Sequence, residues 1–437
     1  MKAFFLLLGL ALFVPSFLNH NGSLEGSFPR VEIGDESHHL LMTYSLIADG
    51  DLDLKNNYRA VHEGSDQAGI AQRGQPLDHH VVWYREGRNI QWWQIYFVDG
   101  SKWDRSPHGT PIPRARVEVP PGLPELPEYS NHPYGLPLLL APFLYPFRGA
   151  PVWIERMALI LMTATSLVGA IGFSTLLRHF GAPEPRIRFV TALAWLGTPI
   201  WYYSGRLFAE GILTALVVWI YALGLAERRW CLVGLLVGLG MQMKLPFVLV
   251  AVPLLLATDL LRSKRNLFAF VVPVLGSVAC SGVLNFLMFG APDRLPQLFW
   301  TGDLVHNFLG FWFDLHHGLL PFVPAVLVAA VAWPGFIRRH GSRGASLLAG
   351  FTLYAMLVIS WNGWFGGACF GPRLIAPVLP LLLASLVALP GWGRIQQVLI
   401  GASFVFGAFG AIHHSSDMEW HPVELLLRNV SGSAHRS

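Results

Sequence analysis

Long apolar segments recur along almost the whole chain and decide what it can fold into. A helix needs roughly 20 apolar residues to cross a bilayer. Composition agrees with a membrane class, because 53% of the 437 residues are hydrophobic and only 13% are charged, a balance too apolar for a soluble globular domain. The sequence therefore predicts an all-α polytopic membrane protein of about 11 transmembrane helices. The segments that reach or approach this length lie at residues 3–18, 152–176, 187–204, 207–227, 231–244, 246–262, 266–289, 318–335, 345–361, 372–390 and 395–413.

The basic residues predict which loops face the cytoplasm. With Lys2 on the cytoplasmic side, five inside loops carry Lys and Arg, as the positive-inside rule requires. These residues are Arg178, Arg186 and Arg188; Arg228 and Arg229; Arg262, Lys264 and Arg265; Arg338, Arg339 and Arg343; and Arg394. We expect a first transmembrane helix at 1–18, an outer loop at 19–150, a helix bundle at 151–413 and an outer tail at 414–437. Cleavage of the first segment as a signal peptide stays open as an alternative.

The outer loop changes character along its length. Residues 36–48 place apolar side chains at helical spacing, which predicts a helix lying on the membrane surface with Asp35 at its head. Residues 79–98 are rich in β-branched and aromatic residues around an Arg-Glu-Gly-Arg-Asn turn, which predicts a small β hairpin. A proline-rich loop then leads into "HPYGLPLLLAPF".

Several chemistries find no support in the residues. Cys231, Cys280 and Cys369 have neither zinc nor redox spacing. The outer histidines form adjacent pairs whose side chains point apart on a helix or strand, so a bound metal is not favoured. The chain has no Gly-rich nucleotide loop and no dinucleotide-binding fingerprint. We therefore expect no cofactor and no nucleic-acid partner.

A few charged residues stand at the outer ends of the apolar segments. Arg206, Glu210, Lys244 and Arg373 lie there, and a charge at membrane depth usually faces a cavity or a ligand. Arg206 and Lys244 would instead snorkel to lipid headgroups in the simplest structural reading, and Glu210 would be a favourable charge at a helix start. Arg373 is harder to explain structurally, because it follows a loop rich in Gly and Trp and precedes a proline-broken segment.

These motifs, taken in order, resemble a known family. The order is the acidic pair Asp35-Glu36 followed by "DGDLDL", then "HPYGLPLLLAPF", Glu210, "GFWFDLHHGLLPFVPA" and "WNGWFGGACFGPRLIAPVLPLL". The pattern covers most of residues 30–390 and is similar to the membrane glycosyltransferases of the GT-C fold. Within that fold it resembles relatives of protein mannosyltransferases and lipid A aminoarabinose transferases (glycosyltransferase family 39-like). The stretch between "NNY" and "HPYG" is longer than the family pattern leads us to expect, and two histidines follow the acidic pair.

The resemblance implies a glycosyltransferase that takes its sugar from a polyprenyl-phosphate-linked donor and passes it to a hydroxyl of a glycan, lipid or protein. It implies that Asp35 is the catalytic base, with Glu36 beside it. Transfer also needs cations for the departing phosphate, for which Arg373, Lys244 and Arg206 are the candidates. The residues expected to bind substrate are His132, Glu210, Asp314 and Trp364.

Structural readings of the same residues remain open. Asp35 is also a good helix N-cap, His132-Pro133 would fix the entry of a helix, and Trp364 fits an interfacial aromatic belt. The alternative function is a lipid-linked sugar flippase or another membrane transporter, although the paired halves typical of transporters are not visible. We expect an integral protein of the bacterial inner (plasma) membrane with its active site facing the periplasm or exterior.

Overall fold

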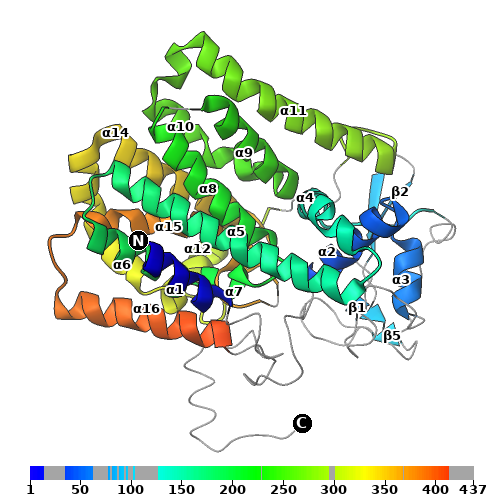
Figure 1. Ribbon diagram of the computed structural model, residues 1–437, viewed down its shortest axis with the longest axis horizontal. Coiled ribbons are helices and arrows are strands. Elements are labelled where there is room, and N and C mark those ends of the chain that lie inside the picture. Colours follow the sequence, from blue (N-terminus) through cyan, green and yellow to red (C-terminus); the bar gives the residue numbers. More distant parts are fainter. Residues whose placement is uncertain are drawn as a thin grey trace, which may run out of the picture.

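Helices make up most of the structure. The computed structural model describes residues 1–13, 35–62, short strands between 77 and 103, and residues 126–227, 229–294, 301–367 and 369–412. Figure 1 shows the longer helices as a bundle, with α2, α3 and the strands gathered at one end. The bundle elements are α1 (Lys2–Phe13), α5 (Pro151–His179), α6 (Glu184–Leu196), α7 (Ile200–Ser204), α8 (Ala209–Leu225), α9 (Trp230–Met243), η7 (Leu245–Val250), α10 (Val252–Ala257), η8 (Asp259–Arg262), α11 (Lys264–Phe289), α12 (Leu304–Phe313), α13 (Leu319–Phe322), α14 (Ala325–Ser360), η9 (Arg373–Val378), α15 (Leu379–Leu383), η10 (Ala384–Ala388) and α16 (Arg394–Ile412).

Four of the described helices are long and apolar enough to cross a membrane: Trp153–His179 within α5, and α11, α14 and α16. Helix α14 joins two predicted segments, 318–335 and 345–361, and its backbone is non-helical at Gly341 (φ 56°, ψ −137°). The helices at the other predicted segments are shorter, or are divided into two or more pieces. Proline often stands where such a helix is interrupted. The predicted count of eleven spans stays a prediction.

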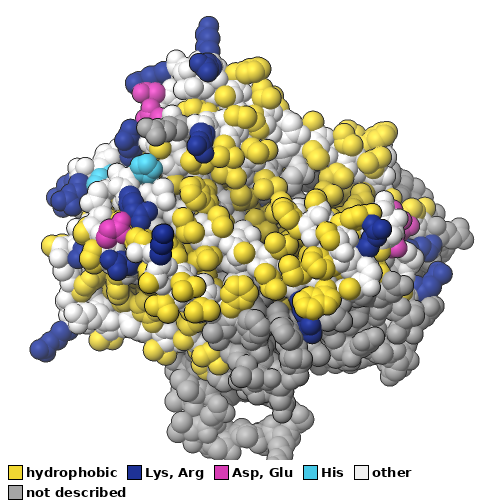
Figure 2. All heavy atoms as spheres, viewed as in Figure 1, with side chains coloured by type: hydrophobic (Ala, Val, Ile, Leu, Met, Phe, Trp, Pro, Cys, Tyr) yellow, Lys and Arg dark blue, Asp and Glu magenta, His cyan; other side chains and the backbone are white. Residues whose placement is uncertain are grey.

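Helix α11 shows how apolar the outer surface is. It packs along α9, while Phe268, Leu275 and Leu287 on its other face are 72%, 60% and 65% exposed. Such a large exposed apolar surface fits contact with lipid tails. Figure 2 shows hydrophobic side chains over much of one face of the bundle.

Helices α9 and α11 approach each other closely because small residues line their contact. A Cβ added to Gly238 would lie 2.9 Å from Cβ of Ser277. Nε2 of Gln242 donates to the carbonyl oxygen of Ser277 at 2.7 Å, and Oγ of Ser277 donates to the carbonyl oxygen of Gly238 at 2.6 Å. Small residues and hydrogen bonds between helices are the usual means of helix association in membranes.

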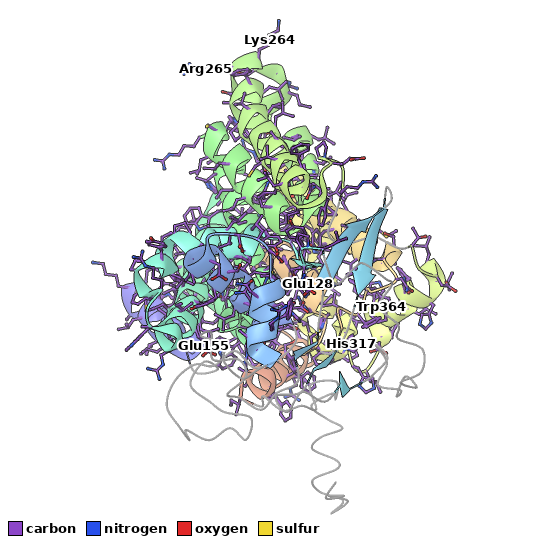
Figure 3. The ribbon with its side chains drawn as sticks, turned by 90° about the vertical axis from the view of Figure 1, so that its right-hand side faces the viewer. Glu128, Glu155, Lys264, Arg265, His317 and Trp364 are labelled. Atoms are coloured by element: carbon purple, nitrogen blue, oxygen red, sulfur yellow. The ribbon has the colours of Figure 1, made fainter. Side chains whose placement is uncertain are left out.

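The basic loops meet at one end of the bundle. Arg343 pairs with Glu227 at 3.0 Å, and Arg186 donates to the carbonyl oxygen of Pro390 at 3.4 Å. Figure 2 shows many Lys and Arg side chains along the left and upper edge of the molecule and a few at its right-hand side, and Figure 3 places Lys264 and Arg265 at the far tip of α11. These contacts fit the predicted assignment of the loops to a single side.

Helix α8 separates this end from the opposite one. It begins at Ala209, next to Glu210, and ends at Leu225, two residues before Glu227. Its 17 residues span about 26 Å at 1.5 Å per residue, close to the thickness of a bilayer core. Glu210 and Glu227 therefore lie at opposite ends of a helix about as long as a bilayer core is thick.

The outer segment packs onto the Glu210 end of the bundle. It contains α2 (Asp35–Tyr44), η2 (Ser45–Asp49), α3 (Lys55–His62), α4 (Gly135–Leu144) and η6 (Tyr145–Phe147), with β1 (Leu77–Asp78), β2 (Val81–Arg85), β3 (Arg88–Trp92), β4 (Ile95–Tyr96), β5 (Lys102–Trp103) and β6 (Tyr129–Ser130). Strands β2 and β3 pair antiparallel, with Val81 opposite Trp92, within the segment where the sequence predicts a hairpin. Strand β6 joins the other edge of β2, and β1, β4 and β5 form a second small sheet.

The surface helix expected at residues 36–48 differs from the structure in one respect. Helix α2 begins at Asp35, as the sequence suggests, but every residue from Glu36 to Tyr44 is buried. It packs against α4, so its polar side chains meet protein groups rather than water or lipid headgroups. The amphipathic pattern predicts a helix here, and the polar side chains of this helix face the candidate site.

Candidate active site

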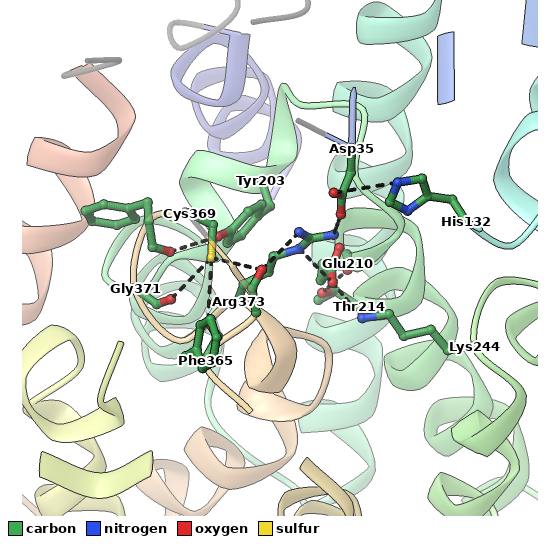
Figure 4. A network of polar contacts seen from close by, with 12 residues as sticks. Asp35, His132, Tyr203, Glu210, Thr214, Lys244, Phe365, Cys369, Gly371 and Arg373 are labelled. Carbon is green, nitrogen blue, oxygen red and sulfur yellow. Dashed lines mark hydrogen bonds and ion pairs between the residues drawn. The ribbon is translucent and has the colours of Figure 1, made fainter. Parts of the chain in front are cut away.

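Four segments that are far apart in the sequence bring charged side chains together (Figure 4). Asp35 is the first residue of α2, and Glu210 lies in the first turn of α8. Lys244 follows the last residue of α9, and Arg373 is the first residue of η9. All four were predicted site residues, and their meeting places the candidate site at the Glu210 end of the bundle.

Arg373 is the centre of this charged network. Its NH2 group lies 2.6 Å from Oδ2 of Asp35, and its Nε lies 3.1 Å from Oε1 of Glu210. The same Glu210 oxygen accepts from Nζ of Lys244 at 2.6 Å. Glu210 is fully buried, whereas the side chain of Lys244 is 25% exposed. Two carboxylates and two cations thus balance one another within the network.

Local backbone structure explains how Arg373 is held. The preceding loop turns through Gly366, Gly367 and Gly371, whose φ angles of 82°, 83° and 61° favour glycine. The carbonyl oxygen of Gly366 accepts from NH1 of Arg373 at 3.3 Å. The guanidinium also lies 4.2 Å from the centre of the Phe208 ring, a cation–π contact. Arg373 is therefore held on several sides at once.

Electrostatics keep Asp35 ionised. Burial raises the pKa of its carboxyl group, but the charge of Arg373, supported by His132 and His39, outweighs burial and holds the pKa well below its usual range. In this state Asp35 is a weak base, because a base with a low pKa accepts a proton poorly.

Histidines lie on the other side of Asp35. Nε2 of His132 is 3.9 Å from Oδ1 of Asp35, and its ring stacks on His38 with the centres 5.2 Å apart. Nδ1 of His38 is 2.7 Å from the hydroxyl of Tyr58. The two carboxylate oxygens of Asp35 therefore face different groups, Oδ2 towards Arg373 and Oδ1 towards the histidines.

Glu36 and Arg206 form a second buried pair. Oε1 of Glu36 accepts from the backbone N–H of Leu207 at 2.6 Å, and Oε2 lies 3.9 Å from NH1 of Arg206. Glu36 is fully buried, Arg206 is 2% exposed, and the guanidinium lies over the ring of Tyr202 at 5.2 Å. The pair ties α2 to the connection between α7 and α8, which carries Phe208 and leads into the first turn of α8, where Glu210 lies.

Asp314 and Trp364 lie on neighbouring outer loops, apart from the contacts of Arg373. Oδ1 of Asp314 accepts from the backbone N–H groups of His316 and His317 at 2.8 and 2.7 Å. Burial raises the pKa of Asp314, but these hydrogen bonds and the His317 side chain lower it to about 2. Trp364, labelled with His317 in Figure 3, packs against α12 at Gly310.

His39 and Phe208 are site residues that the sequence reasoning did not assign. The spacing of Asp35 and His39, four residues apart in a predicted helix, already places both on one face, so His39 was open to prediction. Nothing in the sequence pairs Phe208 with a residue 165 positions later. Within the described part of the chain, no group of three His, Cys, Asp or Glu side chains has metal-binding geometry.

The fold and the site together define a helical integral membrane protein with a buried carboxylate–cation network at one end of its bundle. Scans against protein-family models and against curated proteins find no match. Among solved structures, ArnT from Cupriavidus metallidurans is similar to this chain, in the apo state at 14% identity and bound to undecaprenyl phosphate at 15%. Each likeness has a TM-score of 0.49 and covers 88% of this chain. This chain spans 59% of the length of ArnT.

Proposed function

We propose that the protein transfers a sugar from a polyprenyl-phosphate-linked donor to an acceptor hydroxyl at the outer face of a bacterial inner membrane. One observation carries the proposal: a carboxylate, Asp35, and two cations, Arg373 and Lys244, meet in one network at the end of α8 that carries Glu210. These are the groups that such a transfer needs, a base for the hydroxyl and positive charge for the departing phosphate.

The proposed transfer forms one bond to the anomeric carbon and breaks another. The acceptor oxygen attacks the anomeric carbon of the sugar, and the bond from that carbon to the phosphate oxygen breaks. The phosphate leaves with the electron pair as a monoester, which carries one more negative charge than the donor diester. The proton of the acceptor hydroxyl passes to Asp35. Arg373 and Lys244 stabilise the charge that develops on the phosphate.

Asp35 contacts Arg373 in this structure, and we infer that the donor phosphate displaces Asp35 from the guanidinium. Lys244 is the more accessible of the two cations, at 25% exposed against 11% for Arg373, so the phosphate meets Lys244 first. Once the guanidinium turns to the phosphate, Asp35 loses the charge that lowers its pKa and becomes a stronger base. Donor binding thereby prepares the base for the acceptor.

The remaining predicted residues have supporting roles in this proposal. Glu210 holds Arg373 and Lys244 at one shared oxygen and so sets the spacing between the two cations. Glu36 and Arg206 position α2 and with it Asp35 in this proposal. The catalytic role predicted for Glu36 and the phosphate-binding role predicted for Arg206 stay predictions. Asp314 and Trp364 stay candidates for contact with the donor sugar or lipid.

The proposal is tested by sugar transfer from polyprenyl-phosphate donors with purified Arg373→Ala and Arg373→Lys proteins. A charge-assisted contact is worth about 2–3 kcal/mol, so Arg373→Ala should slow transfer on the order of a hundredfold. Arg373→Lys should also slow transfer, because the ammonium group of lysine lacks the planar array of N–H donors with which a guanidinium binds several acceptors at once.

The matched control is Arg262→Ala, since Arg262 is 85% exposed at the basic end and pairs with Asp259. It should transfer at the native rate. Native transfer by a folded Arg373→Ala protein would remove Arg373 from the mechanism, and no transfer by the native protein from any polyprenyl-phosphate sugar would refute the proposed function.

A further inference from the structure

Nδ1 of His39 is a buried polar atom that has no hydrogen-bond partner among the described residues. His39 is only 4% exposed. Burying such an atom without a partner is unfavourable, and native proteins contain few of them. An unpaired atom beside the candidate base therefore calls for an explanation.

His39 lies on the same side of α2 as Asp35. The two residues are four positions apart in one helix, so their side chains are neighbours on one face, with Cβ atoms roughly 5–6 Å apart. His132 is close to both residues. The centre of its ring lies 5.4 Å from that of His39, and its Nε2 lies 3.9 Å from Oδ1 of Asp35. Asp35, His39 and His132 thus border one small region, away from the Oδ2 atom that contacts Arg373.

This region favours a neutral ligand. Burial lowers the pKa of His39 to about 4, with Arg373 and His38 adding to the effect and Asp35 and Glu210 opposing it. The imidazole is therefore uncharged at neutral pH and offers a hydrogen-bonding nitrogen rather than a positive charge. Such a group suits a hydroxyl better than a phosphate.

We propose that Asp35 and His39 form a two-point site for a carbohydrate acceptor that carries neighbouring hydroxyl groups. One hydroxyl attacks the donor sugar and gives its proton to Asp35, and the adjacent hydroxyl donates a hydrogen bond to Nδ1 of His39. A serine or threonine side chain has one hydroxyl and leaves Nδ1 unpaired. This inference rests on the proposed function and assigns the class of its acceptor.

The test is the binding of methyl glycosides and their matched monodeoxy analogues to the full-length protein in nanodiscs that contain undecaprenyl phosphate, measured by saturation-transfer NMR. At least one glycoside should bind about tenfold more tightly than the analogue that lacks a neighbouring hydroxyl. His39→Phe should bind the two equally, and His39→Gln, which keeps a hydrogen-bonding group, should retain part of the difference.

The control is His38→Phe, because Nδ1 of His38 already faces Tyr58; this variant should keep the preference. Thermal unfolding separates a binding role from a structural one: removing an unpaired polar atom should leave the Tm of His39→Phe unchanged or higher, so a large fall in Tm would favour a structural role. Preference retained in His39→Phe, or no glycoside bound by the native protein, would overturn the inference. Sugar transfer to a peptide hydroxyl in the same preparation would overturn it while leaving the proposed function intact.

Discussion

Replacing Asp35 with Asn should slow transfer sharply and yet tighten the binding of a polyprenyl phosphate. Asp35 contacts Arg373 at 2.6 Å, in the position that we assign to the donor phosphate. Asparagine has almost the same size but carries no charge, so it competes poorly for the guanidinium. The variant therefore separates two roles of the Asp35 side chain, the base and the partner of Arg373 that competes with the donor phosphate.

The size of the effect follows from this contact. A hydrogen bond to a charged group contributes about 1.5–3 kcal/mol, and the side chain of Asp35 is 25% exposed, so solvent screening favours the lower figure. About 1.5 kcal/mol corresponds to roughly tenfold tighter binding. Transfer should fall by about a hundredfold to ten-thousandfold, the usual contribution of a general base.

Binding of undecaprenyl phosphate to the purified protein can be measured by native mass spectrometry, with transfer measured in parallel. Asp259→Asn is the matched control, because its carboxylate is 62% exposed and pairs with Arg262 at the basic end; it should change neither quantity. If Asp35→Asn bound the lipid phosphate no better than the native protein, Asp35 would not compete for Arg373. If it transferred sugar at the native rate, Asp35 would not be the base.

Three further results are expected. Tags at Ser65 should react from outside the cell and tags at Ser263 and Ser342 from the cytoplasm only, by the positive-inside pattern; Ser65 and Ser263 on one side would overturn the topology. Glu36→Gln should lower stability by up to about 3–5 kcal/mol, because it removes a buried charge that faces the buried Arg206, and thermal unfolding with unchanged Tm would contradict this. The acid limb of kcat should lie at higher pH than that of kcat/KM for the donor, since the phosphate raises the pKa of Asp35 by drawing its cation away; coincident limbs would argue against displacement.

The sequence predicts the parts of the site better than their connections. Apolar length and the basic loops place the helices, and the cost of charge at membrane depth singles out Glu210, Lys244 and Arg373. The ion pair between Asp35 and Arg373 joins residues 338 positions apart, and no local pattern reports such a contact. The adjacent acidic residues also do not show by themselves which way each side chain points. Glu36 is buried in the protein interior, whereas Asp35 faces Arg373.

The packing of α9 on α11 has a consequence for the bilayer in which the protein works. Gln242, which hydrogen-bonds to α11, stands two residues before Lys244, the cation at the end of α9. Helix α11 exposes apolar side chains along much of its length and would meet lipid there, and a helix tilts when the hydrophobic thickness around it changes. A tilt of α11 would pull on the end of α9 and shift Lys244 relative to Glu210. We therefore expect transfer rates to vary with acyl-chain length in reconstituted membranes, and Gln242→Leu to weaken that dependence.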